Sequence, residues 1–294
     1  MERSNYPATY RAMSAASANN QRTHFRLLKL QVAVLLSIAI VSAANWQLFP
    51  ALRTVSIVVA SFLIALSFVQ LFVQIQRYDR KWFASRAVAE SVKVQMWRFM
   101  MKVSPYHNST DTATSIEHFV GDVQQMLKEQ QDAKLVAGSV PVQGTEVSQF
   151  MLDQRNKSVA ERRDLYVKGR IQDQKDWYSK KAVSNSKSYN GWFAATFVLQ
   201  SASGVIALLV VLFPGFPFNP AGVVATLAAS GISWMNAKSY RELSQSYGLI
   251  AHDLAGYESI ARETDSQEKL EKLVSNVESR ISGEHTFWKA RRLF

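Results

Sequence analysis

The sequence of 294 residues contains no cysteine, which excludes a disulfide framework, a thiolate nucleophile and a cysteine-ligated metal site. Its five histidines are scattered, and no two of them lie four residues apart as metal ligands on one helical face do. The sequence also lacks a glycine-rich phosphate-binding loop and a Gly-x-Ser-x-Gly nucleophile elbow. We therefore expect a protein without enzymatic activity, without a bound metal and without a cofactor.

Charged residues are absent from three long stretches of the chain, over residues 30–49, 54–76 and 188–237. A transmembrane helix needs about 20 apolar residues, so the first two stretches can each cross a bilayer once and the third can cross twice. A signal peptide would have a shorter apolar core followed by a cleavage site, whereas here the first stretch leads through Pro50 straight into the second. Prolines divide the third stretch near its middle. We predict four transmembrane helices in two hairpins, over about 30–49, 54–75, 192–213 and 220–237.

Lysine and arginine are distributed unevenly around these four predicted helices. Five precede the first helix, 19 lie between the hairpins and nine follow the last helix, but the two hairpin tips contain only Arg53. By the positive-inside rule, the side that carries the cations and both termini is the cytoplasm. Topology and attraction to anionic headgroups then account for the net charge of +11, and nucleic acid is not an expected partner.

The same pattern divides the chain into regions. Residues 1–24 are basic, lack apolar periodicity and are predicted to form a mobile tail. Residues 25–104 contain the first hairpin, whose second helix is expected to continue into the cytoplasm without a break. Residues 105–145 form a connector with a short helix over about 112–136, capped by the polar residues before it. Residues 146–294 hold the second hairpin, at about 192–237, between cytoplasmic helices.

Apolar residues also recur at helical spacing outside the membrane segments. A charged helix is predicted from Thr145 into the third span. Apolar residues over 240–261 alternate in steps of three and four, as in helices that pack against other helices. The last helix is predicted to start at a capping box formed by Thr264 and Gln267. The predicted fold class is all-α, a polytopic membrane protein with a cytoplasmic helical bundle formed by extensions of the membrane helices.

Uncharged polar residues share faces of three predicted membrane helices. One interpretation is ordinary packing, because small and hydroxylated residues let transmembrane helices approach and hydrogen-bond. In a ring of several copies, the same faces could instead line a pore. No ionisable residue occurs at membrane depth, which argues against a proton-coupled transporter. The candidate pore-lining residues are Ser67, Gln70 and Gln74 on the second helix, Gln200 and Ser203 on the third, and Thr226, Ser230 and Ser233 on the fourth.

A dense pattern of charged and aromatic residues follows the first hairpin. On a helix, Arg86, Glu90, Lys93 and Trp97 step by four, three and four residues, so opposite charges meet along one stripe. The stripe is either a structural contact between helices or the seam that couples a cytoplasmic trigger to the membrane helices. A direct contact between Glu90 and Arg170 is one hypothesis for this seam. The candidate assembly or gating residues are Tyr78, Arg80, Trp82, Arg86, Glu90, Lys93, Trp97, Arg98, Arg170, Trp177 and Tyr178.

Two sequence runs resemble one known family. The first, over residues 77–98 directly after the first hairpin, reads RYDRKWFASRAVAESVKVQMWR. The second, over residues 166–182 directly before the second hairpin, reads YVKGRIQDQKDWYSKKA. Together with the terminal Glu284, His285 and Trp288, these runs resemble SLATT domains, the SMODS- and SLOG-associating two-transmembrane effectors, in a two-unit arrangement.

This resemblance implies a protein of the bacterial inner membrane, encoded beside nucleotide-signalling or other conflict-system genes. Such proteins are expected to form homo-oligomers and to perturb or permeabilise the membrane when a separate sensor or nucleotide-signalling enzyme detects infection. The expected partners are the lipid bilayer, further copies of the chain and a protein encoded nearby. A different class of function stays open, namely a non-catalytic scaffold that holds a cytoplasmic sensor or enzyme at the membrane.

Overall fold

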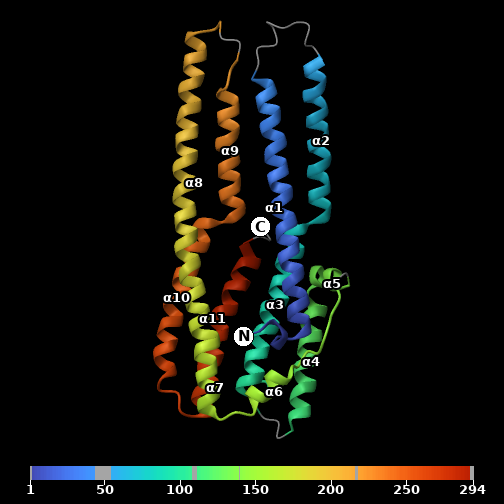
Figure 1. Cartoon of the computed structure of the whole chain (residues 1–294), viewed down its shortest axis with the longest axis vertical. Coiled ribbons are helices and arrows are strands. Elements are labelled where there is room, and N and C mark those ends of the chain that lie inside the picture. The colour runs from blue at the N-terminus through green and yellow to red at the C-terminus, as the bar shows by residue number, and fades with distance from the viewer. Residues whose placement is uncertain (1, 44–53, 108–110, 139, 216–217, 292–294) are drawn as a thin grey trace. The chain divides into compact units, whose positions relative to one another are not determined.

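The computed structural model describes residues 2–43, 54–107, 111–138, 140–215 and 218–291. These ranges are predominantly helical and contain no β-strand, so the all-α prediction is confirmed for them. The elements in chain order (Figure 1) are the 3₁₀ turn η1 (Arg3–Asn5), α1 (Ala8–Ser42), α2 (Thr54–Gln76), α3 (Tyr78–Met101), α4 (Thr112–Glu129), α5 (Gln131–Ala137), α6 (Gln149–Arg155), α7 (Val159–Tyr166), the π-helical turn η4 (Val167–Gln172), α8 (Asp173–Leu212), α9 (Ala221–Lys238), α10 (Tyr240–Ala261) and α11 (Gln267–Arg291).

The helices form two compact units. The first, here called the bundle unit, comprises Met1–Arg22, Tyr78–Lys181 and Ser246–Phe294. The second, here called the apolar unit, comprises Thr23–Arg77 and Ala182–Gln245. The long helices α1 and α8 contribute residues to both units. The three charge-free stretches of the sequence fall in the apolar unit, whereas all of the candidate assembly or gating residues fall in the bundle unit.

Three helical stretches are long and apolar enough to cross a membrane. They are α1, the stretch Ile57–Met101 and the stretch Val159–Leu212, and only 6% of each apolar window is buried. Large side chains in these windows are highly exposed, for example Phe68 at 68% and Val211 at 77%. Such extensive apolar exposure is unfavourable in water and is matched by the hydrocarbon layer of a bilayer. The structure therefore supports a membrane protein with at least these three apolar helices.

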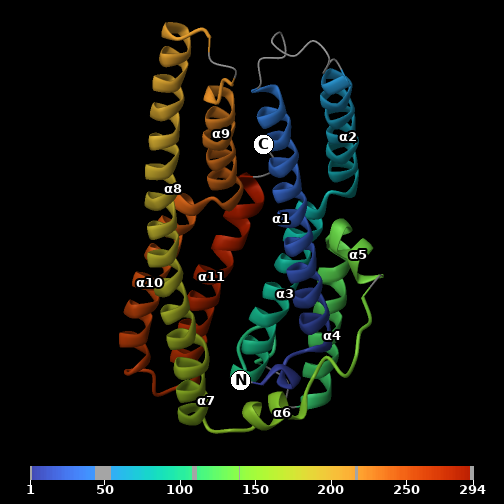
Figure 2. The same cartoon turned by 45° about the horizontal axis from the view of Figure 1, so that its top comes forward.

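The shorter helix α9 lies beside α8 and α1 in both views of the molecule (Figures 1 and 2). A Cβ atom added to the buried Gly231 would lie 2.5 Å from Thr196 Cγ2 of α8, so glycine permits this close approach. At the other end of α9, the backbone N–H of Asn219 donates to the carbonyl oxygen of Ala43 over 2.7 Å. The predicted first and second hairpins therefore contact each other within one chain. The predicted tip of the first hairpin, residues 50–53, lies outside the described residues.

In the bundle unit, α3 is the central helix and packs against α4, α5, α6, α7 and α11. Its C-terminal half is buried on nearly every side, as the side chains of Val92, Met96, Phe99, Met100 and Met101 are all fully enclosed. The predicted apolar seams on the last two helices are also present. The buried residues on α10 are Tyr247, Ile250, Leu254 and Ala261, and those on α11 include Leu270, Val274, Val277 and Ile281.

The N-terminal segment is folded, and the prediction of a mobile tail over residues 1–24 is wrong. Helix α1 begins at Ala8, and the side chains of Ala8, Ala12 and Met13 are buried. The Thr9 hydroxyl donates to Glu146 Oε1 over 2.7 Å, which ties the helix start to the loop before α6. Small residues spaced four apart form this buried stripe, and their weak apolar pattern is masked by the polar residues between them.

Several predicted helices are interrupted. The helix expected to run unbroken from the second span into the bundle ends at Gln76, because Arg77 has φ 45°, a left-handed conformation that non-glycine residues rarely adopt. The connector helix begins where predicted, and Asp111 accepts from the Ala113 N–H over 3.0 Å. It is divided into α4 and α5 at Gln130.

The charged helix predicted from Thr145 is broken as well. It is divided after Arg155, and α7 restarts with a capping box between Ser158 and Glu161. From Val159 the chain then continues through η4 and α8 to Leu212, so the expected passage into the third apolar stretch is confirmed.

A buried ionic cluster as candidate functional site

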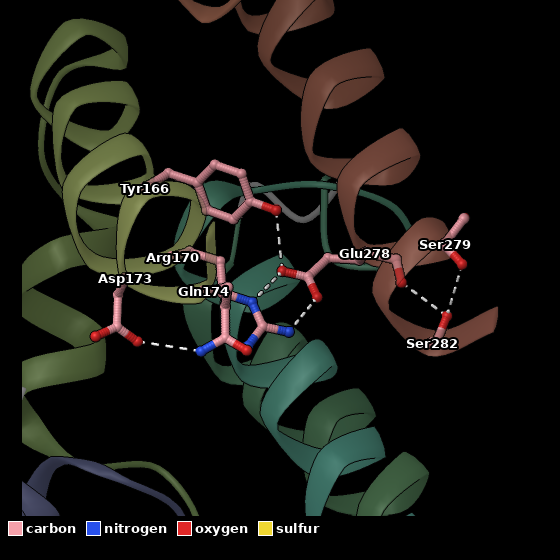
Figure 3. Close-up of polar contacts among 7 residues, drawn as sticks. All are labelled: Tyr166, Arg170, Asp173, Gln174, Glu278, Ser279 and Ser282. Carbon is pink, nitrogen blue, oxygen red and sulfur yellow. Dashed lines mark hydrogen bonds and ion pairs between the residues drawn. The ribbon is translucent and has the colours of Figure 1, made fainter. Parts of the chain in front are cut away.

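The centre of the candidate site is a fully buried ion pair between Arg170 of η4 and Glu278 of α11 (Figure 3). Arg170 Nε and Nη2 donate to the two carboxylate oxygens of Glu278 over 2.9 and 2.6 Å. The Tyr166 hydroxyl donates to the same carboxylate over 2.9 Å. Paired, parallel hydrogen bonds of this kind are the strongest that arginine makes with a carboxylate. The geometry therefore fixes η4 against α11.

The buried groups have shifted protonation equilibria. Burial by itself would lower the pKa of Arg170, but the Glu278 carboxylate and its hydrogen bonds leave that pKa raised. Burial also raises the pKa of Tyr166 well above its usual value, and the negative charge of Glu278 adds to the effect. The guanidinium is therefore charged and the phenol neutral throughout the physiological pH range.

The local backbone explains how Arg170 becomes buried. The chain from Val167 to Gln172 forms a π-helical turn, in which one extra residue per turn changes which side chains face inward. Gly169 lies in this turn, and a Cβ atom there would be 3.1 Å from Trp97 Cη2 of α3. Trp97 also packs edge-on against Tyr166, with ring centroids 5.5 Å apart. The turn and α3 are therefore in intimate contact around the ion pair.

The predicted stripe on α3 lies against this ion pair. Trp97 is buried, whereas Glu90 and Lys93 are half-buried. Burial lowers the pKa of Lys93, and the nearby Arg170 lowers it further, while Glu90 and Glu278 oppose this. The hypothesis of a direct Glu90–Arg170 contact is not supported, because the Arg170 guanidinium forms its hydrogen bonds with Glu278. The negative charge of Glu90 is near enough to help raise the pKa of Arg170. Glu278 was missed, although it lies four residues after Val274 on the apolar stripe of α11.

The other candidate seam residues have separate surroundings. Trp82 is buried and stacks on Phe83 at 4.3 Å between ring centroids, whereas Arg80 is exposed, and Tyr78 and Arg86 are half-buried. The Arg98 charge acts on Tyr166. Trp177 and Tyr178 do not join the ion pair. They form an aromatic cluster with Tyr247 of α10, with centroid distances of 5.4 and 5.3 Å.

Some polar atoms of the cluster lack partners. Among the described residues, Arg170 Nη1 and Trp97 Nε1 are buried without a hydrogen-bond partner. Buried donors without partners are uncommon in folded proteins and are costly, since desolvation is not compensated. The centre of the cluster is therefore stabilised by three hydrogen bonds to Glu278, whereas two N–H groups at its edge have no hydrogen-bond partner.

The N-terminal segment adds two tyrosines to the surroundings of the cluster. Tyr6 and Tyr10 stack with ring centroids 4.6 Å apart. Burial raises the pKa of Tyr10 to about 12, with a further contribution from the negative charge of Glu90. Sequence reasoning missed both residues because it treated the segment as unfolded.

A second polar arrangement surrounds the C-terminal end of α3. Arg155 donates to the carbonyl oxygens of Phe99 and Tyr106 over 2.6 and 2.8 Å, and Arg162 donates to that of Met101. These cations face the negative end of the α3 dipole, and burial lowers the pKa of both arginines.

The predicted capping box of the last helix, formed by Thr264 and Gln267, is wrong because Gln267 has another partner. The Gln267 amide is used at the end of α3, where its Nε2 donates to the carbonyl oxygen of Lys102 over 2.8 Å. Ser266 instead accepts from the N–H of Lys269 at the start of α11. The Gln267 side chain, which the local pattern assigned to the start of α11, is therefore used in a long-range contact with the end of α3.

The polar residues proposed to line a pore have mixed surroundings. Ser67 and Thr226 donate to carbonyl oxygens of their own helices, over 3.0 and 2.8 Å, and Ser203 of α8 donates to the Ala221 oxygen of α9 over 2.9 Å. These three hydroxyls are thus satisfied within the chain, as packing residues would be. Gln70, Gln200 and Ser233 are exposed and Ser230 is half-buried, whereas the side chain of Gln74 lies outside the described part.

No metal site is evident in the part of the chain that the structure describes, where no group of three or more histidine, aspartate and glutamate side chains could hold an ion. The buried cluster holds the opposite charges of Arg170 and Glu278 in a low-dielectric environment, between helical segments that are distant in sequence. Such a cluster can store and release electrostatic energy when helices move, because its members are poorly solvated.

Comparison with known families gives two matches that together extend over nearly the whole chain. Residues 7–163 match the SMODS and SLOG-associating 2TM effector domain 3, and residues 166–288 match the SMODS and SLOG-associating 2TM effector domain 1. The chain belongs to the SLATT family. Its two-unit arrangement agrees with the resemblance found in the sequence, and the first SLATT match begins inside the folded N-terminal segment. No curated protein and no solved structure matches the chain.

The two SLATT matches meet in the ionic cluster. Lys93 and Trp97 belong to the first SLATT match, whereas Tyr166, Arg170 and Glu278 belong to the second. Because all five residues lie in the bundle unit, the cluster is a contact between the two SLATT regions within one compact body. This position makes it the best candidate for communication between them.

Proposed function

We propose that this protein is a non-catalytic effector of the bacterial inner membrane that acts in a conflict or anti-phage system. On activation it oligomerises and perturbs or permeabilises the membrane. The observation that carries the proposal is the presence of two SMODS- and SLOG-associated effector domains along one chain. The association named in these domains supports a sensor or nucleotide-signalling protein, encoded nearby, as the source of the trigger.

In the proposed topology, α9 is a fourth transmembrane helix, and both termini are cytoplasmic. Its support is the close packing of α9 against α8 and its lack of charge from Ala221 to Ala237. The 33 of 34 lysine and arginine residues outside the hairpin tips support the orientation through the positive-inside rule. Each SLATT region then contributes one hairpin to the membrane.

The ionic cluster is the proposed gating seam. A trigger that moves α11 must either separate Glu278 from Arg170 or carry η4 along with α11, and either event changes the contact of η4 with α3. η4 continues directly along the chain into α8, which carries the third apolar stretch, so the seam and that stretch belong to one continuous helical segment. The unpartnered Arg170 Nη1 supports a second arrangement in which that donor is satisfied.

One observation favours the alternative of a membrane scaffold. The hydroxyls of Ser67, Ser203 and Thr226 already have partners within the chain, so their presence does not require a pore. A scaffold would hold its cytoplasmic partner at the bilayer without changing the permeability of that bilayer.

The deciding experiment is measurement of inner-membrane potential and growth after induced expression, with and without the neighbouring genes. The test variant is Glu278→Gln, and the matched control is Glu268→Gln on the same helix, where the carboxylate is 79% exposed. The effector proposal expects triggered depolarisation that the test variant alters and the control preserves. If the native protein never depolarises cells in the presence of its neighbours, the scaffold becomes the better explanation.

A further inference from the structure

Two lysines from helices distant in sequence converge on one indole ring in the apolar unit. Lys29 of α1 and Lys238 of α9 place their Nζ atoms 5.7 and 5.1 Å from the ring centroid of Trp234. Lys238 Nζ also lies 3.5 Å from the ring centroid of Phe25, which is buried and packs against Trp234 at 5.7 Å. The two ammonium groups are therefore held on a shared aromatic platform.

Within the described part of the chain, no carboxylate pairs with either of these two charges. Neither lysine forms an ion pair among the described residues, and the sequences of α1 and α9 contain no aspartate or glutamate. In the whole apolar unit, Glu242 is the single acidic residue of the sequence, against seven lysines and arginines. Aromatic faces attract cations but leave most of the ammonium N–H donors unused. The arrangement is thus complementary to an external anion.

Sequence position fixes the depth of this pair. Lys29 is the last charged residue before the charge-free stretch 30–49, and Lys238 is the first after the stretch 188–237. Both cations therefore stand at one boundary of the apolar helices, where tryptophan is enriched in membrane proteins because its ring suits the headgroup layer. Lysines at this depth extend their ammonium groups towards the headgroups and keep their stems on apolar surface.

We propose that Lys29 and Lys238, supported by Trp234 and Phe25, form a binding site for the phosphate of an anionic phospholipid between α1 and α9. Basic pockets between transmembrane helices bind such headgroups on the cytoplasmic side of membranes. Because α1 and α9 belong to different SLATT regions, a lipid bound there links the two regions at the membrane surface. The site rests on the proposed insertion of both helices into a bilayer.

The site is tested by native mass spectrometry of the full-length protein in detergent, titrated with phosphatidylglycerol or phosphatidylcholine. The native protein is expected to retain phosphatidylglycerol at least tenfold more tightly than phosphatidylcholine. The double variant Lys29→Gln, Lys238→Gln should lose this preference, and the double variant with arginine at both positions should keep it. Lys187→Gln is the matched control, since Lys187 is an exposed lysine of the same unit.

Two results would overturn the site. One is equal retention of phosphatidylglycerol by the native protein and the glutamine double variant. The other is displacement of the lipid by millimolar inorganic phosphate, which would assign the lysines to free phosphate. Lipid retention does not depend on depolarisation, so the two proposals fail separately. Lipid selectivity without depolarisation would count against the effector alone, and depolarisation without selectivity would count against the site alone.

Discussion

Replacing Glu278 with glutamine should destabilise the bundle more than any other single change that conserves side-chain shape. The neutral amide leaves the Arg170 charge buried without compensation and weakens the hydrogen bond from Tyr166. Removing one partner from a buried ion pair typically costs about 3–5 kcal/mol. For a body the size of the bundle unit, roughly 2–4 °C per kcal/mol converts this into a fall in apparent Tm of roughly 6–20 °C.

The assay is thermal unfolding of the full-length protein in detergent, followed by tryptophan fluorescence, to which the buried Trp97 beside Tyr166 contributes. Glu268→Gln is the control, because its exposed i,i+4 pair with Lys272 is screened by solvent and should contribute little to stability. The double variant Arg170→Met, Glu278→Leu removes both charges and should be more stable than either single variant. Additive losses in the double variant, or a Glu278→Gln protein as stable as the control, would refute this account of the ion pair.

Three further predictions concern other parts of the chain. Gly231→Ala should weaken the packing of α9 on α8 by about 1–3 kcal/mol, because the new Cβ would lie 2.5 Å from the Thr196 methyl group. Gly204→Ala, where a Cβ meets open space, is the control and should be neutral in the same unfolding assay. Because burial raises the pKa of Tyr10 from 10.0 to about 12, its neutral form stabilises the fold fully below about pH 10 and this contribution is lost as the pH rises towards 12. Apparent Tm should thus fall over that window and fall less steeply in Tyr10→Phe; equal slopes would contradict the assignment. Arg162→Met removes hydrogen bonds to the carbonyl oxygen of Met101 at the end of α3, to that of Lys157 and to the Gln267 side chain, so hydrogen exchange at the end of α3 should increase. Arg163→Met is the comparison, because half-buried Arg163 donates to the Thr264 carbonyl oxygen and not to α3, and it should have a smaller effect there.

Long-range patterns in the sequence predicted the outlines of this fold well. The charge-free windows located the apolar helices, and steps of three and four located the buried faces of α10 and α11, because burial of a whole face imposes its period on the sequence. The Asp111 cap was also predictable, since an N-cap is a local interaction.

Features decided by tertiary contacts were not predictable in the same way. The N-terminal segment folds through small residues and through hydrogen bonds to residues more than 130 positions away, as the Thr9–Glu146 pair illustrates. The π-helical turn packs at Gly169 against Trp97 of α3, a contact between distant residues that no local pattern encodes. Glu278 carried a detectable signal, a carboxylate on an apolar helical stripe, but its partner could not be chosen among several basic residues from spacing alone.

The central position of α3 has a consequence for how the protein is made. This helix is synthesised before α11, the helix that covers it, and just after α3 the backbone N–H of Ser104 donates to Glu271 of α11, 167 positions later in the chain. At synthesis rates of about 5–20 residues per second, the apolar surface of α3 waits roughly 8–33 s for its partner. The interval favours chaperone binding to the nascent chain. Until α11 has been synthesised, the face of α3 that it covers therefore stays open and the bundle cannot close.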